Sequence, residues 1–281
     1  MNRAARPRRL PPLSIHRGLS AVSVTVLLIL LARMVPALAQ DRGFYVGVTA
    51  PMEYLDVTFE KTVDNTDPNT LVPAPQAGQI LQDQDSSKSL TYGFGFVAGY
   101  HLPFPGTGFF ASVEFDVELP RGTVDGRLPG IGSSPGRNQL GESWPEDWSF
   151  EKKRSYGVAF KLGGSPGPLN FWDLRLYGLA GIRLVEAEFT TRFNGCLSPV
   201  PCATGEFTSG TTSRDQDYKG WVAGAGVEKM LGDHIGFRAE VRRPKSGNER
   251  WTTPFSDVAV TVPASVTARG THLSIGLITY F

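Results

Sequence analysis

The feature that most constrains this chain is a series of segments, each about ten residues long, in which apolar residues alternate with small or polar ones. Residues 89–101, SLTYGFGFVAGYH, place aromatic and aliphatic side chains on one face and largely glycine on the other. A period of two residues is that of a β-strand whose faces meet different surroundings. The sequence therefore predicts an all-β protein.

Eight such segments can be counted beyond the N-terminal region. They begin near 43–48 and continue at 89–101, 109–119, 153–163, 173–189, 218–230, 235–243 and 267–281. In the first of them the alternation changes phase around Pro51, which predicts a bulge or a strand end there.

Alternation alone fits a soluble sandwich as well as a membrane barrel, but the connections favour the barrel. About thirty residues rich in Asp, Asn, Pro and Gln join the first two segments, and the short turn LPFPGTG joins the next two. Long and short connections continue to alternate, as in outer-membrane barrels, where the long loops lie outside the cell. We expect an eight-stranded antiparallel up-and-down transmembrane β-barrel.

The N-terminal region differs from the rest. Residues 1–39 contain six arginines and no lysine or acidic residue, then an apolar run from Leu19 to Leu31, then Ala37-Leu-Ala39. This order predicts a signal peptide, 1–39, cleaved before Gln40, and leaves 40–281 as the barrel domain. The rest of the chain carries 22 basic and 27 acidic residues, which gives no reason to expect a nucleic-acid partner.

Residues 220–242, GWVAGAGVEKMLGDHIGFRAEVR, carry a recognisable pattern: a Gly-Trp start, G-x-G-V-E, a short turn and R-x-E-x-R. This segment resembles the penultimate hairpin of the OmpA/OmpX-like outer-membrane β-barrel (porin or opacity-type) family. The resemblance implies a barrel in the outer membrane of a Gram-negative bacterium. Some members carry a peptidoglycan-binding domain after the barrel, and this chain ends at the last strand, so none is expected.

Strand parity turns a set of charged side chains toward the lumen. They are Glu114, Asp116, Glu118, Lys161, Arg175, Arg183, Glu228, Arg238, Glu240 and Arg242. An eight-stranded barrel is only wide enough for its own side chains, and isolated buried charges are costly, so these groups should pair across the lumen. We expect a salt-bridged plug; the alternative is a gated ion path.

Four other positions bear on chemistry. Cys196 and Cys202 are the two cysteines, and an oxidising compartment predicts a local disulfide between them. His272 and Ser274 lie two apart on the last strand, a pairing similar to that of lipid A deacylases, but no acid lies at a suggestive spacing and both face the lumen. We therefore predict no catalytic residues, metal site or cofactor.

The favoured function is a non-enzymatic structural or surface-interaction protein that presents four long loops on a rigid scaffold. A narrow pore is the alternative, and a lipid A-modifying enzyme is the weakest option. Expected partners are outer-membrane lipid and lipopolysaccharide, the outer-membrane assembly machinery, and an extracellular ligand or host surface. Parity places Phe281 on the lipid face, and the resemblance implies that this terminal residue is the assembly signal. Aromatic residues near the predicted strand ends are expected in girdles at the two membrane interfaces; they are Trp221, Trp251, Tyr280, Tyr100 and Phe281.

Overall fold

The computed structural model describes residues 43–132, 139–165, 173–196, 203, 205–245 and 247–281. The chain divides into two units, and the second, Ala39–Phe281, contains every described element. The signal peptide expected at 1–39 lies outside the described residues and stays a prediction. Within the described part of the chain, no helix is long and apolar enough to cross a membrane.

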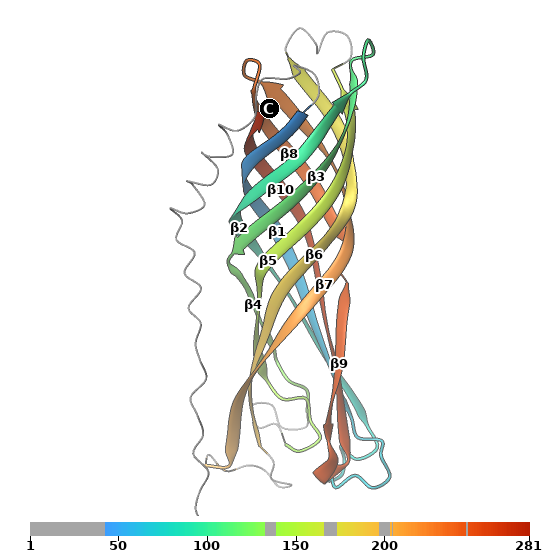
Figure 1. Cartoon of the computed structure of the whole chain (residues 1–281). Helices are drawn as coiled ribbons and strands as arrows, with labels where there is room; N and C mark the ends of the chain where they lie inside the picture. Colours follow the sequence, from blue (N-terminus) through green and yellow to red (C-terminus); the bar gives the residue numbers. More distant parts are fainter. Residues whose placement is uncertain (1–42, 133–138, 166–172, 197–202, 204, 246) are drawn as a thin grey trace, which may run out of the picture. The chain divides into compact units, whose positions relative to one another are not determined.

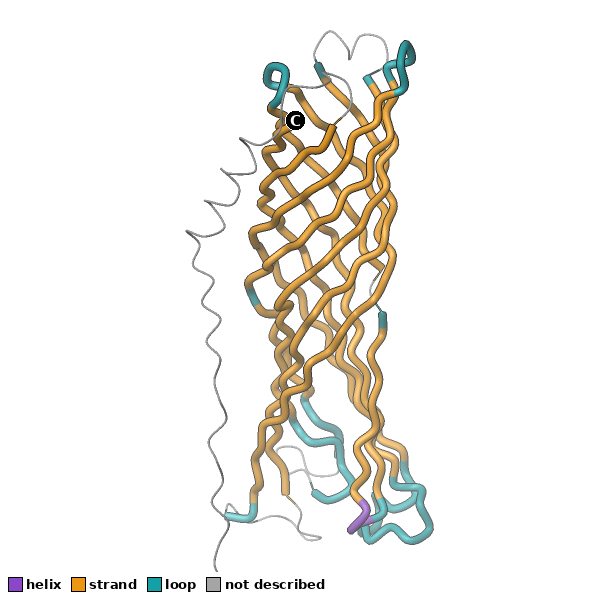
Figure 2. The backbone as a smooth tube through the Cα atoms, viewed as in Figure 1, coloured by secondary structure: helices purple, strands orange, loops and turns teal. Residues whose placement is uncertain are grey.

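Antiparallel strands make up almost all of the described structure (Figures 1 and 2). They are β1 (Gly43–Asp64), β2 (Ile80–Pro103), β3 (Phe109–Arg121), β4 (Thr123–Leu128), β5 (Glu146–Gly164), β6 (Leu174–Cys196), β7 (Phe207–Met230), β8 (Ile235–Lys245), β9 (Asn248–Phe255) and β10 (Val260–Tyr280). A 3-10 turn, Ser256–Val258, joins β9 to β10. Strands β1, β2, β3, β5, β6, β7, β8 and β10 form a closed ring, because β10 pairs with β1. The predicted eight-stranded antiparallel barrel is confirmed.

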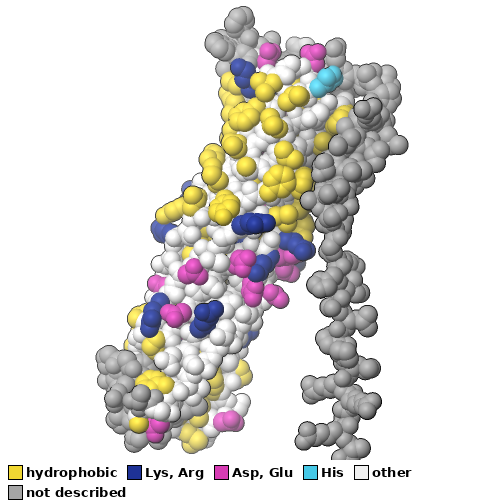
Figure 3. Space-filling view, turned by 90° about the vertical axis from the view of Figure 1, so that its left-hand side faces the viewer, with side chains coloured by type: hydrophobic (Ala, Val, Ile, Leu, Met, Phe, Trp, Pro, Cys, Tyr) yellow, Lys and Arg dark blue, Asp and Glu magenta, His cyan; other side chains and the backbone are white. Residues whose placement is uncertain are grey.

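The outer surface of the barrel divides into two zones. At the end that carries the C-terminus and the short turns, which we call the turn half, large apolar side chains point outward. Among them are Phe94, Phe115, Phe160 and Ile182, which are 46 %, 47 %, 51 % and 68 % exposed. Figure 3 shows these hydrophobic side chains gathered over the upper part of the visible face, with charged side chains at and below their lower edge. We call the lower part, which ends in the long hairpins, the hairpin half.

The ring is continuous only in the turn half. In the hairpin half, β4 pairs with β5 and β9 pairs with β10, and no ladder among the described residues joins β2 to β4 or β7 to β9. The strands therefore separate into two four-stranded sheets, β9-β10-β1-β2 and β4-β5-β6-β7. Positive φ at Gly122 (112°) marks the point where β3 gives way to β4.

The two edges of this sandwich are closed differently. Between β2 and β4, the Asp85 carboxylate accepts hydrogen bonds from the Arg127 backbone N–H (2.8 Å) and from Trp148 Nε1 (2.9 Å). Between β7 and β9, the Arg214 guanidinium lies over the Trp251 ring at 5.2 Å. Side chains, rather than backbone ladders, thus hold the two sheets together at their edges.

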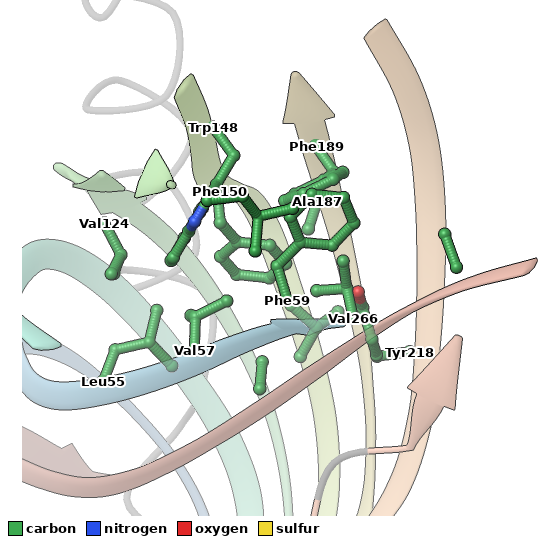
Figure 4. Packing of buried hydrophobic residues seen from close by; sticks show 14 residues of the cluster. Leu55, Val57, Phe59, Val124, Trp148, Phe150, Ala187, Phe189, Tyr218 and Val266 are labelled. Atoms are coloured by element: carbon green, nitrogen blue, oxygen red, sulfur yellow. The ribbon is translucent and has the colours of Figure 1, made fainter. Parts of the chain in front are cut away.

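A hydrophobic core fills the space between the two sheets (Figure 4). Phe59 from β1 and Phe189 from β6 meet edge to face with ring centroids 4.9 Å apart. Trp251 stacks on Phe59 at 6.2 Å, with an angle of 12° between the rings. The girdle position expected for Trp251 is therefore wrong: the ring packs against the core because β9 belongs to the sandwich.

Two expectations about strand limits are also wrong. The connection between the first two strands was expected to contain about thirty residues. It spans only 65–79, because β1 extends to Asp64 and β2 begins at Ile80. The phase change near Pro51 is not a bulge: β1 keeps one register past it, with Thr49 opposite Gly276 and Met52 opposite Leu273. The inward face simply changes from polar to apolar, as Glu53 is followed inside the barrel by Leu55.

Candidate functional site

The lumen of the turn half contains a dense network of charged side chains. All ten residues expected there are placed inside the barrel, and nine of them are buried. Arg175 is the exception, with its side chain 28 % exposed at the rim, 3.5 Å from Glu228. The set holds five acidic and five basic groups, so its formal charges balance.

Glu114 on β3 lies at the centre of this network and is fully buried. Its carboxylate is 2.7 Å from Lys161 Nζ and 3.2 Å from Arg242 Nη2, and it also pairs with Arg238. The Tyr45 hydroxyl donates a hydrogen bond to it at 2.9 Å. Four partners from three strands, β1, β5 and β8, therefore converge on one carboxylate, which compensates the cost of burying it.

A second group of pairs lies deeper in the barrel, toward the hairpin half. The Arg183 guanidinium is 2.7 Å from Asp116 and 2.5 Å from Glu118. Asp116 also lies 2.7 Å from Arg242, which links this group to the central one. Because the pairs connect β3, β6 and β8, they brace the barrel wall across the lumen.

Tyrosines complete the network, and the sequence interpretation missed them. The hydroxyls of Tyr177 and Tyr280 donate hydrogen bonds of 2.6 Å to Glu240 and Glu228. Tyr280 thus faces the lumen, and the girdle position expected for it is wrong. Parity could have shown this, since Tyr280 lies one residue from the outward Phe281.

Glycines make room for two of these rings. Tyr45 lies directly opposite Gly99, and Tyr177 directly opposite Gly226. A Cβ on either glycine would come within 2.4 Å of the facing tyrosine ring. The glycine-rich inner face seen in the sequence is therefore matched to the bulky rings on the neighbouring strands.

Buried charged side chains occupy the lumen where the two halves meet. Glu53 and Lys152, which the sequence interpretation left outside its strands, form a buried pair at 2.7 Å. Beside them is a cavity of about 20 Å³, bordered by Arg183 and His272 among others. That volume holds about one water molecule. The apolar core of the hairpin half follows directly, so a charged layer and an apolar layer are stacked along the barrel axis.

His272 has an acidic neighbour that the sequence did not reveal. Its Nε2 lies 3.0 Å from Glu118 on β3. The absence of an acid at a suggestive spacing did not exclude this contact, because Glu118 and His272 are far apart in sequence and meet across the lumen. Ser274, the second member of the pair, is 4 % exposed and faces the same packed interior.

Of the three remaining predicted positions, Cys196 and Phe281 are described, and they lie at opposite ends of the barrel (Figure 1). Cys196 ends β6 and is buried, whereas Cys202 lies outside the described residues, so the disulfide stays a prediction. Phe281 follows β10, and its backbone N–H donates a 2.9 Å hydrogen bond to the Phe44 carbonyl. The last residue is thus fastened to the first strand.

A closed antiparallel ring with an apolar outer zone and a polar lumen defines an integral outer-membrane β-barrel. The chain belongs to the outer membrane protein beta-barrel domain family, whose model matches residues 25–262. It is a protein of the Gram-negative outer membrane. In barrels of this kind the short turns lie on the periplasmic side and the longer connections outside the cell.

Solved structures with a similar architecture are distant from this chain. The attachment invasion locus protein Ail of Yersinia pestis is 14 % identical, with 79 % of this chain and 97 % of that one covered and a TM-score of 0.27. OprG of Pseudomonas aeruginosa is 14 % identical, with 82 % and 95 % covered and a TM-score of 0.39. The Escherichia coli outer membrane protease OmpT is 9 % identical, with 88 % and 99 % covered and a TM-score of 0.42. No curated protein matches the sequence. None of these likenesses is close enough to transfer an activity.

Proposed function

We propose that this protein is a non-enzymatic surface barrel whose lumen is closed and whose extracellular half displays an interaction surface at its tip. The observation that carries the proposal is the filled interior. A balanced set of ion pairs occupies the membrane-spanning part, and a packed apolar core continues it outside the membrane. Such an interior supports a structural or presenting role over a pore.

The tip of the hairpin half is ordered by contacts between its connections. The Asn65 side chain donates a 2.6 Å hydrogen bond to the Gly141 carbonyl, and the Leu71 backbone N–H donates one to Val258. Leu71, Ile80 and Phe255 are exposed there by 68 %, 57 % and 49 %. Large apolar side chains presented to water at the end of a rigid element are typical of a contact surface for another molecule.

Two measurements test this function. Purified protein in a planar bilayer should show no steady conductance, whereas large, steady current steps would favour the pore. In cells lacking the gene, both the wild-type chain and a variant with 66–78 replaced by a short turn should reach the outer membrane as folded barrels with heat-modifiable gel mobility. Only the wild type should restore any surface attachment, and equal attachment by both would contradict the role given to the tip.

An enzymatic role finds less support. Ser274 and His272 are buried within the barrel, where an acyl chain in the membrane cannot reach them. Incubation of the pure protein with lipid A should release no fatty acid, and release that is lost in Ser274→Ala would contradict this part of the proposal.

We also propose that Phe281 is the signal read by the assembly machinery. Deleting it should sharply lower the amount of barrel in the outer membrane, while deleting a tip residue such as Leu71 should not. Normal amounts of the Phe281-deleted protein would count against it.

A further inference from the structure

Lys and Arg side chains surround the barrel at the outer edge of its apolar zone. On six of the eight ring strands, the outward face changes there from apolar residues to a cation. Lys88 follows Leu90 on β2, for example, and Arg121 follows Leu119 on β3. We call this set the basic collar; it consists of Lys88, Arg121, Arg154, Lys219, Arg243, Lys245 and Arg269.

Six of the seven collar cations form no ion pair among the described residues, although Glu186 lies opposite Arg154 and Asp56 opposite Arg269 in the strand ladders. Lys88 lies 3.2 Å from Asp56, but no described acidic side chain lies within 4.0 Å of the other six cations. Lys153, one residue from Arg154, shows the contrast, since it pairs with Glu151 at 2.6 Å and Glu188 at 2.8 Å. Exposed cations without partners keep their full capacity to bind an anion.

The collar is dense in one sector. Arg243 and Lys245 point outward from β8, and Lys245 lies opposite Trp221, the neighbour of Lys219 on the outward face of β7. On the next strands, Asp56 of β1 has Arg269 on one side and Lys88 on the other. Five cations thus follow one another across this sector, with Asp56 between two of them and Asp217 two residues from Lys219 on the same face.

The other edge of the apolar zone has no comparable set. Among the described strands, Lys229 is the cation that points outward close to the periplasmic turns. The basic residues therefore mark one membrane interface, that of the outer leaflet. Cations held at the level of the headgroups attract anionic lipid by about 1 kcal/mol each.

We propose that the basic collar binds the phosphate groups of phosphorylated lipid in the outer leaflet, chiefly through the sector formed by β7, β8 and β10. Arginine and lysine donate charge-assisted hydrogen bonds to phosphate oxygens, and Trp221 lies beside them at the depth where an indole ring prefers the membrane interface. This inference goes beyond the proposed function, because it concerns the lipid around the barrel and not what the tip contacts.

The test compares two triple variants of the full protein in detergent, titrated with bisphosphorylated lipid A. R243Q/K245Q/R269Q removes three collar charges, and R127Q/R192Q/R250Q removes three exposed charges nearer the tip. Heat-modifiable gel mobility reports that each variant is folded. If the collar triple does not fold, the double variant K219Q/K245Q replaces it.

Lipid A should bind the collar triple about a hundredfold more weakly than the wild type, because each charge contributes about a factor of five. The tip triple should bind like the wild type. Dephosphorylated lipid A should bind all forms equally weakly, and inorganic phosphate at equal concentration should not compete, which separates the lipid from the free ion. Equal affinity of the wild type and the collar variant, or binding of dephosphorylated lipid A as tight as that of the phosphorylated form, would overturn the proposal.

Discussion

The two halves of this barrel share six strands, and the inward and outward faces of the two halves have opposite polarity. In the turn half, Glu114 is buried inside and the adjacent Phe115 is 47 % exposed outside. In the hairpin half, Phe59 is 2 % exposed inside and the adjacent Glu60 points outward. The difference follows from the surroundings: lipid receives apolar side chains in one half and water receives polar ones in the other. Alternation therefore identifies two faces of a strand, but not which face is inside.

The largest effect is expected from Glu114→Gln in the turn half. Loss of this carboxylate leaves Lys161, Arg238 and Arg242 short of a partner in a buried network, which should cost about 5 kcal/mol. Urea unfolding in lipid vesicles should show this loss, while Asp215→Asn on the exposed part of β7 should leave the free energy of unfolding nearly unchanged. Equal stability of the two variants would show that the ion pairs are not what holds this half together.

The matching change in the hairpin half is Phe59→Ala. It removes a ring from the centre of the apolar core and should destabilise that half by about 4 kcal/mol. Trypsin added to intact cells should then cleave the hairpin half quickly, although heat-modifiable mobility persists. Phe115→Ala, which removes an outward ring, should leave the trypsin pattern unchanged, and equal sensitivity of both variants would remove the distinction between the halves.

A smaller effect is expected from Gly226→Ala. The added methyl group would meet the Tyr177 ring at 2.4 Å and displace it from Glu240, which should cost about 2 kcal/mol. Gly178→Ala is the matched control, since its nearest atom is 4.0 Å away and the site faces outward. The temperature of the gel-mobility change should fall for the first variant alone; a similar fall for both would mean that lumen packing is not the cause.

The smallest effect is expected on the outer face of the hairpin half. A hydrogen bond from Lys153 lowers the pKa of the Glu188 carboxyl. The associated stability is present above the ordinary glutamate pKa and is lost as the pH falls through the lowered value. Because the pair is exposed and screened by salt, Glu188→Gln should leave the unfolding curve at neutral pH unchanged. A clear loss at neutral pH would show that the outer face contributes more than this comparison allows.

Much of the membrane-spanning half could be predicted from the sequence, and much of the other half could not. Parity and short turns place Glu114 and Arg238 in the lumen, since each strand there alternates without interruption. In the hairpin half, the polar run 82–86 of β2 looks like a loop in the sequence, because its inward-facing Asp83 and Asp85 accept hydrogen bonds from the next connection and from β4 instead of packing on the apolar core. The contact of Glu118 with His272 needed the closed ring, because no local pattern relates β3 to β10.

The central claim is that the chain beyond the membrane is a packed extension of the barrel and not a set of loops. Hydrogen exchange of the folded protein in lipid vesicles tests it most directly, strand by strand. Backbone amides of Leu55–Phe59 should exchange as slowly as those of Phe44–Val48, because both segments are paired on two sides. Exchange of Leu55–Phe59 within seconds, with Phe44–Val48 still protected, would contradict the account.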